Sequence, residues 1–431
     1  MPPAMMQTRT IRATAQNMCD PVTKGRLFWA AVLVSLAMLW SPGAEGAEFS
    51  LKPSLTLSEE YDNNIYLSKD DRVGDYITRV LPSIDLAYKS ALWEWKANYT
   101  LNWWYYARQN ESFDSHILDL VSKTKVIDNF LNLDVQDHYS SVVLDPRKPS
   151  TDTNLETNRT DTNNFMASPT ITYAINPAMT LTAGYRYTNI WYRDSNSINR
   201  QMHTGFASLQ NTFSPNITAA LGVEYMADKP EDPEPNNDQL EFYAHGIYKI
   251  DPKTEFQARV GYRWITFDAG SDEARLLYDF LFTRRLYGTG AIEVKANSIF
   301  TTSPDFGVLE SRSEELAVRY GETLSLRAAV FHKKDTYFET DREDEIYGIT
   351  AGMEYKASPR LSAKVNGRYE KDRYQPEDEN RDLYTLSGEI SYKVTEKATV
   401  ILANAFTKSD ADIDTDSYDD NVVAIRLKIT F

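Results

Sequence analysis

The sequence predicts an all-β fold, an antiparallel transmembrane β-barrel of about 20 strands that follows a cleaved signal peptide. Three observations predict it: apolar and polar residues alternate along most of the chain, short turns recur at nearly regular intervals, and one apolar run lies near the N-terminus. A transmembrane helix needs about 20 consecutive apolar residues. The mean hydropathy of −0.49 therefore excludes a bundle of such helices.

The apolar run covers Leu27–Trp40 and follows the basic residues Lys24 and Arg26. Small residues come directly after it. A basic segment, an apolar stretch and a small-residue cleavage site are typical of a secretory signal peptide, whereas a membrane anchor would need a longer run. We predict cleavage after Gly46, with Ala47 as the second choice.

The chain thus divides into a signal peptide, residues 1–46, and an outer-membrane β-barrel, residues 47–431. Translation starts at Met1 or at Met18, and the second start gives a signal peptide of ordinary length. Cys19 is the one cysteine, so the mature chain has no disulfide and no cysteine metal site.

Strands are predicted from the period of two. Between residues 255 and 267, Phe256, Val260 and Tyr262 alternate with Arg259 and Arg263. Alternation over about 9 to 11 residues is typical of a half-buried strand, and a tilted strand of that length crosses a bilayer.

Two kinds of connection separate these strands. Short turns are predicted at Ser90, Asp128, Pro177, Pro215, Pro252, Gly288, Gly321, Pro359 and Glu396. Longer polar loops are predicted at residues 62–75, 140–161, 228–238, 375–381 and 411–420. Bacterial outer-membrane barrels have short periplasmic turns and longer extracellular loops. Ten hairpins give 20 strands, and 18 is the alternative because Pro53, Pro82 and Pro169 disfavour three of them.

One face of the strands carries charges that lipid would not tolerate, because Arg or Lys costs about 2 to 4 kcal/mol at the bilayer midplane. We therefore assign that face to the lumen, either water-filled or packed with ion pairs. The lumen-facing charged candidates are Arg186, Arg259, Arg263, Arg327, Arg368, Glu255, Glu315 and Glu389, and Lys295, Arg319, Lys364 and Arg426 share their face.

The C-terminal strand has the pattern that outer-membrane assembly machinery reads. Val423, Ile425, Leu427 and Ile429 alternate strictly, and the chain closes on Phe431. We predict Phe431 as an assembly signal. The predicted location is the outer membrane of a Gram-negative bacterium, with membrane lipids, lipopolysaccharide and the assembly machinery as partners.

Aromatic residues crowd toward strand ends, as at residues 103–106, which is typical of interfacial girdles. An aromatic track for sugars inside the lumen is the alternative interpretation, and its inward candidates are Tyr192, Tyr243 and Phe331. A soluble solenoid or propeller is less consistent with this placement.

No pattern in the sequence indicates an enzyme or a cofactor site. The five histidines, which lie on different hairpins without a nucleophile motif or paired metal spacing, are His116, His138, His203, His245 and His332. Carboxylates alternate in residues 410–420, as Ca²⁺ favours, but the run lacks the glycine and closing glutamate of an EF-hand loop, so we favour a solvated acidic loop. The net charge of −16 also argues against a nucleic-acid partner.

The segments Ser58–Tyr66, Asp75–Ser83 and Gly184–Arg193 resemble a family of outer-membrane β-barrel porins associated with exopolysaccharide and PEP-CTERM (exosortase) gene clusters. The resemblance extends over the mature chain in hairpin layout. It implies a passive conduit for exopolysaccharide export, with a polysaccharide and periplasmic export proteins as partners. It supplies no catalytic residues.

Two other functions stay open. One is a general or solute-specific porin, which a long loop folded into the lumen would favour; residues 140–161 form the one loop long enough. The other is the sheath of a porin–cytochrome electron conduit.

Overall fold

The structure is a computed structural model that describes residues 47–154, 158–338, 340 and 342–431. The predicted signal peptide, residues 1–46, lies outside the described residues. Among the residues that are described, no helix is long and apolar enough to span a bilayer.

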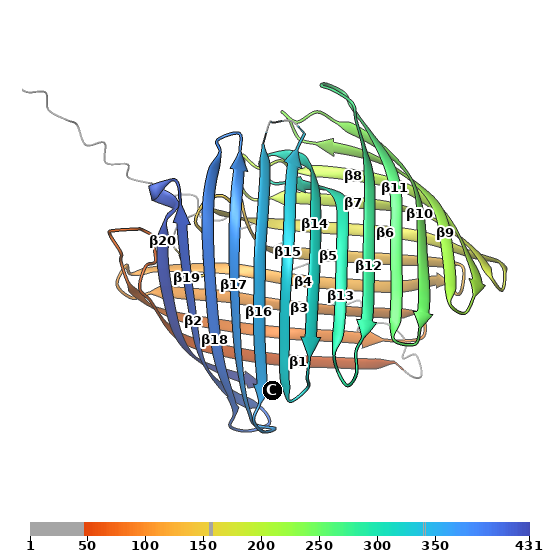
Figure 1. Cartoon of the computed structure of the whole chain (residues 1–431). Helices are drawn as coiled ribbons and strands as arrows, with labels where there is room; N and C mark the ends of the chain where they lie inside the picture. Colours follow the sequence, from red (N-terminus) through yellow and green to blue (C-terminus); the bar gives the residue numbers. More distant parts are fainter. Residues whose placement is uncertain (1–46, 155–157, 339, 341) are drawn as a thin grey trace, which may run out of the picture. The chain divides into compact units, whose positions relative to one another are not determined.

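Twenty strands follow one another along the chain, with one short 3₁₀ turn before the last (Figure 1). They are β1 (Glu48–Asp62), β2 (Asp75–Lys89), β3 (Trp93–Tyr106), β4 (Glu111–Ile127), β5 (Leu131–Val143), β6 (Arg159–Asn176), β7 (Met179–Tyr192), β8 (Arg200–Ser214), β9 (Ile217–Pro230), β10 (Asn237–Asp251), β11 (Thr254–Phe267), β12 (Glu273–Arg285), β13 (Ala291–Ser303), β14 (Gly307–Tyr320), β15 (Leu324–Tyr337), β16 (Glu343–Lys356), β17 (Leu361–Gln375), β18 (Glu379–Lys393), β19 (Ala398–Ala411) and β20 (Tyr418–Thr430).

The sheet closes on itself. Each strand pairs antiparallel with the next, and β20 pairs with β1, where Leu55 lies opposite Ile429 and Asp62 opposite Val422. Closure gives every strand a partner on both sides, so backbone groups in the wall bond to one another rather than to water. The prediction of an antiparallel barrel is confirmed, with 20 strands rather than the alternative 18.

All nine predicted short turns lie between strands, from residues 90–92 to 394–397. The loops at the other end of the barrel are shorter than predicted. Polar residues that the sequence assigned to these loops continue the strand pairing. The loop predicted at residues 375–381 shrinks to 376–378, since Gln375 pairs with Glu343 and Arg381 with Ala411. The strands accordingly have 13 to 18 residues, longer than the bilayer alone requires.

The three suspect prolines do sit in strands. Two of them interrupt a ladder: the pairing of β2 with β3 skips from Val80 to Ser83, around Pro82, and that of β6 with β7 skips from Ala167 to Thr170, around Pro169. Proline lacks the N–H that a ladder needs, so the strands persist at the cost of local hydrogen bonds.

The two faces of the wall differ as lipid and lumen require. On β11, Val260, Tyr262 and Trp264 belong to a large set of exposed apolar side chains that continues around the barrel. Arg259 and Arg263 lie on the other face and bond to carboxylates there. The apolar face is therefore the lipid-facing one.

Aromatic side chains mark both ends of β3 on that outer face. Tyr88 and Trp93 are in ring contact beside one short turn, with the buried Trp95 against both, and Trp103 stacks on Tyr105 at the opposite end of the strand. Such bands are typical of membrane interfaces.

The girdle prediction for residues 103–106 was wrong for two of the four. Tyr106 and Trp104 lie on the inner face and pack with Ile65 and Ile77 in a small buried cluster. Alternation sends every second residue of a strand inward, whatever its type.

Candidate functional site in the barrel interior

The inner wall carries cross-strand ion pairs. Glu241 on β10, 2% exposed, accepts a hydrogen bond of 2.9 Å from Arg259 and also binds Arg263. Arg263 donates to Gln239 at 3.0 Å. The two arginines thus share one carboxylate, which holds them to the wall.

The other lumen-facing candidates lie on the same inner face but in separate groups. Arg327 donates to Glu315 at 3.2 Å, and Arg368 pairs with Glu370. Glu255 accepts from Gln257 and Glu389 from Ser391, each at 2.7 Å. Their role in passage through the barrel remains a prediction.

Sequence reasoning missed Glu241 and Glu370, the carboxylates that neutralise Arg259, Arg263 and Arg368. Both lie on the inner face, because Glu241 is two residues from Tyr243 and Glu370 two residues from Arg368, which alternation assigned inward. What alternation does not reveal is the register between neighbouring strands, which decides the pairs.

Three inner-wall aromatic side chains share one arrangement. Each ring lies against a glycine of a neighbouring strand, so that an added Cβ would clash with it, and each contacts a guanidinium on the same wall. The guanidinium carbon lies 5.3, 3.8 and 4.6 Å from the ring centroid, within cation–π range, in three sets. These sets are Gly184, Phe206 and Arg186; Gly222, Tyr243 and Arg259; and Gly348, Phe331 and Arg368.

These rings are flat against the wall and do not project as a continuous track. Of the predicted inward aromatics, Tyr243 and Phe331 belong to the sets, and Phe206 joins them unpredicted. Tyr192 is instead buried at the end of β7, where its N–H donates to Asn199. The three inner-wall rings are therefore separate from one another and do not form the continuous path that the sugar-track interpretation requires.

A further feature of the interior is the connection between β5 and β6. We call residues 144–154 the crossing segment. Arg147 in it donates to Asp344 at 3.0 and 2.7 Å and to Glu377 at 2.8 Å. Those partners belong to β16 and the β17–β18 loop. In a ring of 20, ten steps separate β6 from β16 in either direction, so the segment reaches the opposite wall.

More contacts hold the crossing segment on that wall. Arg342 binds both Asp145 of the segment, at 3.3 Å, and Asp344, at 2.7 Å. Arg381 donates to the carbonyl of Arg147 at 3.0 Å. Burial acts to lower the pKa of Arg342, but the hydrogen bonds that it donates to Asp344, together with the negative charge there, raise it overall. The guanidinium therefore stays charged.

The later part of the segment is tied to the wall near β1 and β3, where the Tyr106 hydroxyl donates to the carbonyl of Thr153 at 2.7 Å. A second bridge joins the β7–β8 and β13–β14 loops: Ser197 donates to Asp305 at 3.0 Å, and the Ile198 N–H to the Pro304 carbonyl at 2.8 Å. Burial raises the pKa of the Asp305 carboxyl. The crossing segment and the contact between these two loops thus both narrow the opening at the loop end of the barrel.

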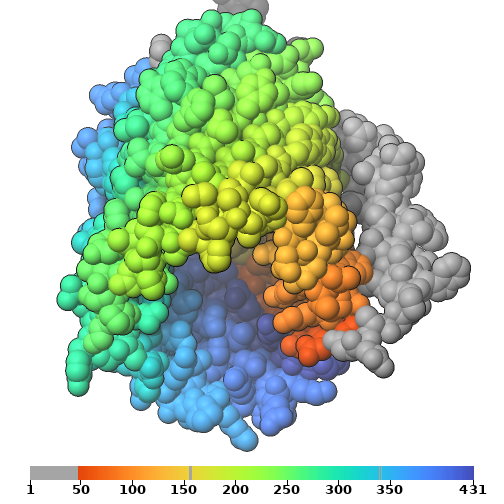
Figure 2. Space-filling view, turned by 90° about the vertical axis from the view of Figure 1, so that its right-hand side faces the viewer, coloured from red at the N-terminus to blue at the C-terminus, as the bar shows by residue number. Residues whose placement is uncertain are grey.

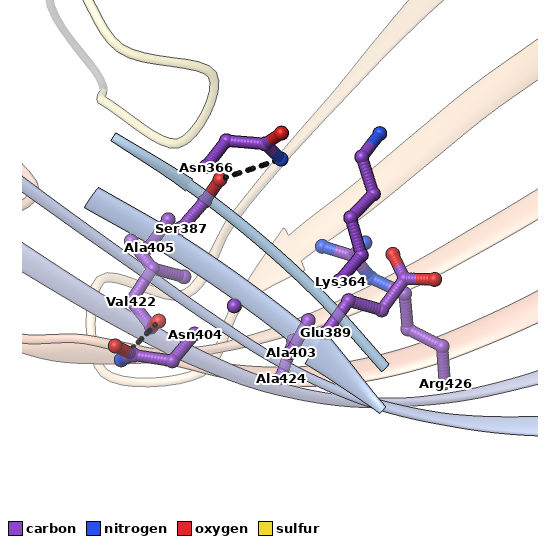
Figure 3. Close-up of a pocket in the computed structure, with 11 residues that line it drawn as sticks. Lys364, Asn366, Ser387, Glu389, Ala403, Asn404, Ala405, Val422, Ala424 and Arg426 are labelled. Atoms are coloured by element: carbon purple, nitrogen blue, oxygen red, sulfur yellow. Dashed lines mark hydrogen bonds between the residues drawn. The ribbon is translucent and has the colours of Figure 1, made fainter. Parts of the chain in front are cut away.

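The end with the short turns is hollowed. Figure 2 shows a recess whose far wall is formed by the blue C-terminal strands, and the red start of β1 lies at its rim. Since the start of β1 pairs with the end of β2, beside a short turn, the recess belongs to that end. Further inside, Lys364, Glu389 and Arg426 line a pocket over the small residues Ala403 and Ala424 (Figure 3).

The acidic run of residues 410–420 contacts the β1–β2 loop and the start of β18. Asp414 binds Lys69 at 2.6 Å and Asp412 accepts from Asn380 at 3.0 Å. The ion pair lowers the pKa of Asp414. Within the described residues, no group of three or more His, Cys, Asp or Glu side chains is placed to hold a metal ion.

Comparison with known proteins gives two kinds of similarity. Residues 319–430, from the end of β14 through β20, match the family model of the surface lipoprotein assembly modifier, over roughly a quarter of the chain. No curated protein matches.

Two solved structures share the fold. One is a mutant of the ferric enterobactin receptor PfeA from Pseudomonas aeruginosa, with a TM-score of 0.51, 10% identity, and 89% of this chain and 80% of that chain covered. The other is the FrpB iron transporter from Neisseria meningitidis, F5-1 variant, with a TM-score of 0.50, 9% identity, and 88% and 82% covered. At such identity the likeness concerns the fold. The closed 20-stranded wall, its apolar outer face and this likeness make the chain an integral outer-membrane β-barrel of a Gram-negative bacterium.

Proposed function

We propose that the chain is a passive, porin-like conduit for hydrophilic solutes, constricted by residues 144–154. The observation that carries the proposal is the seating of this segment on the opposite wall through Arg147 and Arg342. A loop folded into the lumen was the feature expected of a porin. Diameter grows roughly linearly with strand number, so a 20-stranded wall without such a segment would leave a wide, unselective pore.

The contacts of the crossing segment suit a reversible constriction. They are ion pairs and hydrogen bonds between a loop and the wall, and the carboxylates of these pairs range from 4% exposed at Asp344 to 48% at Glu377. The more exposed pair, Arg147 with Glu377, weakens when salt screens it, over a Debye length of about 8 Å at physiological ionic strength. The barrel has no energy source of its own, so solutes would move down their gradients.

Loosening the segment should open the pore. With Arg147→Ala combined with Arg342→Ala, purified protein in planar bilayers should show a conductance several-fold above that of the unaltered chain. Raising the salt concentration should increase the wild-type conductance more steeply than bulk conductivity, because the ion pairs are screened. Lys69→Ala, which removes an exposed pair outside the segment, is the matched control. Equal conductance in all three proteins would contradict a constriction by this segment.

A second candidate is export to the cell surface, either of the exopolysaccharide that the resemblance of the N-terminal segments implies or of a lipoprotein. The observation that favours a lipoprotein is the match of residues 319–430 to the surface lipoprotein assembly modifier family.

A deletion strain separates these functions by what it loses. For the porin, uptake of small hydrophilic solutes falls, while surface polysaccharide and surface-exposed lipoproteins stay at wild-type levels. Normal uptake with depleted surface polysaccharide, or with lipoproteins retained in the periplasm, would assign the barrel to export. Complementation with the Arg147→Ala, Arg342→Ala chain should restore uptake above the wild-type rate.

A further inference from the structure

Two buried carboxylates face each other at the seam where the barrel closes. Asp62 ends β1 and Asp420 lies near the start of β20, and they are 0% and 3% exposed. Asp62 pairs with Val422, so Asp420, two residues away, points to the same inner face. Strand pairing continues past Asp62, where the Asn63 N–H donates to the Asn421 carbonyl at 3.3 Å, so the two carboxyl groups lie on adjacent strands at the seam and interact with each other.

A third oxygen completes the cluster from another part of the chain. Thr153 of the crossing segment is 5% exposed, and its side chain reaches Asp62. The bond from Tyr106 to the Thr153 carbonyl, 2.7 Å long, fixes this residue in place. Thr153 Oγ1, Asp62 Oδ2 and Asp420 Oδ1 are all buried without a hydrogen-bond partner. The seam thus buries three oxygens, from β1, β20 and the crossing segment, that have no hydrogen-bond partner.

Protein cations do not neutralise this cluster. The nearby guanidinium groups of Arg79 and Arg426 both bind Glu60. In the part of the chain that the structure describes, no ion pair joins a basic side chain to Asp62 or Asp420. Leaving two like charges buried and unpaired is strongly unfavourable. Hard divalent cations prefer carboxylate, hydroxyl and carbonyl oxygens and complete their coordination with water.

We propose that Asp62, Asp420 and Thr153 form a binding site for a hard divalent cation, Ca²⁺ or Mg²⁺. The ion balances the two carboxylates and ties the first strand, the last strand and the crossing segment together. The proposed site differs from the acidic run of residues 410–420 that the sequence analysis considered for Ca²⁺. Asp420 is the one residue that the site and the run share. Occupancy of the site sets how firmly the end of the crossing segment is seated.

Terbium, a luminescent substitute for Ca²⁺, tests the site directly. Tb³⁺ added to the full chain in detergent, after treatment with EDTA, should show luminescence sensitised by Tyr106 that saturates and is displaced by Ca²⁺. The variant Asp62→Asn, Asp420→Asn should lose that signal at the Tb³⁺ concentration that saturates the unaltered chain. Asp70→Asn, a change to an exposed carboxylate in the β1–β2 loop, should keep it. Retention of the signal in the double variant would overturn the proposal.

The unaltered chain supplies a second measurement that does not depend on the variant folding. Since a ligand that binds only the folded state stabilises it, Ca²⁺ should raise the unfolding temperature and EDTA should lower it. In the double variant, two neutral amides replace the repelling carboxylates, so neither addition should shift the unfolding temperature. If neither Ca²⁺ nor Mg²⁺ changed the unfolding temperature of the wild-type chain, the metal site would be rejected. The two carboxylates would then share a proton instead.

Discussion

Replacement of Arg200 by alanine is expected to lower the free energy of unfolding by about 3 to 5 kcal/mol. Arg200 is 1% exposed and pairs with Asp228 at 2.5 Å and with Glu234, both of which are equally buried. Removing the guanidinium leaves two carboxylates buried without a counter-charge, and this penalty exceeds the loss of the bonds themselves. Equilibrium unfolding in urea, with the barrel folded into lipid vesicles, measures the change.

Arg327→Ala is the matched control for that measurement. Arg327 also pairs with an acidic side chain on the inner wall, but the two side chains are 59% and 30% exposed. Solvated pairs contribute about 0 to 1 kcal/mol. If both substitutions destabilised the barrel equally, the group around Arg200 would be solvated rather than buried.

Arginine in place of Val260 is expected to cost about 2 to 4 kcal/mol of folding into bilayers. Val260 lies in the middle of β11, is 39% exposed on the apolar face and pairs with Tyr278 of β12. The guanidinium would have to leave water for hydrocarbon, far from either interface. Heat-modified mobility on gels and tryptophan fluorescence follow the fraction that folds into vesicles.

The control for this substitution lies three residues away on the inner face. Gln257→Arg places the same group beside Glu255 and should fold normally. Acidic substitution of Arg259 would be a poor control, because Glu241 would then face a like charge. Equal damage at positions 257 and 260 would mean that the assignment of the two faces is wrong.

The period of two and the turn residues were enough to predict the strands, because both are local properties of the chain. Every predicted short turn was found, and Val260 and Arg259 lie on the faces that alternation assigned. The strand ends on the loop side of the barrel were harder to predict. Gln375 and Arg381 look like loop residues but still pair with neighbouring strands. Beyond the lipid, the wall can be polar on both faces, so alternation no longer marks a strand.

For the interior, the sequence predicts the chemical character of the side chains but not which of them are in contact. Alternation gives a charged lumen, but the crossing segment depends on Arg147 meeting Asp344, 197 residues later in the sequence. No local pattern in the sequence around Arg147 distinguishes it from a solvated loop arginine. The same holds for Thr153, Asp62 and Asp420, which come from three separate parts of the chain.

The position of these anchors along the chain has a consequence for the order of assembly. The crossing segment leaves β5, yet Asp344, Glu377 and Arg381 lie on or between β16, β17 and β18. The segment has no partners on the opposite wall until these strands have joined the sheet. A growing barrel therefore keeps an unobstructed interior through most of its formation. The constriction is among the last features to appear, and it depends on the stretch that matches a known family, residues 319–430.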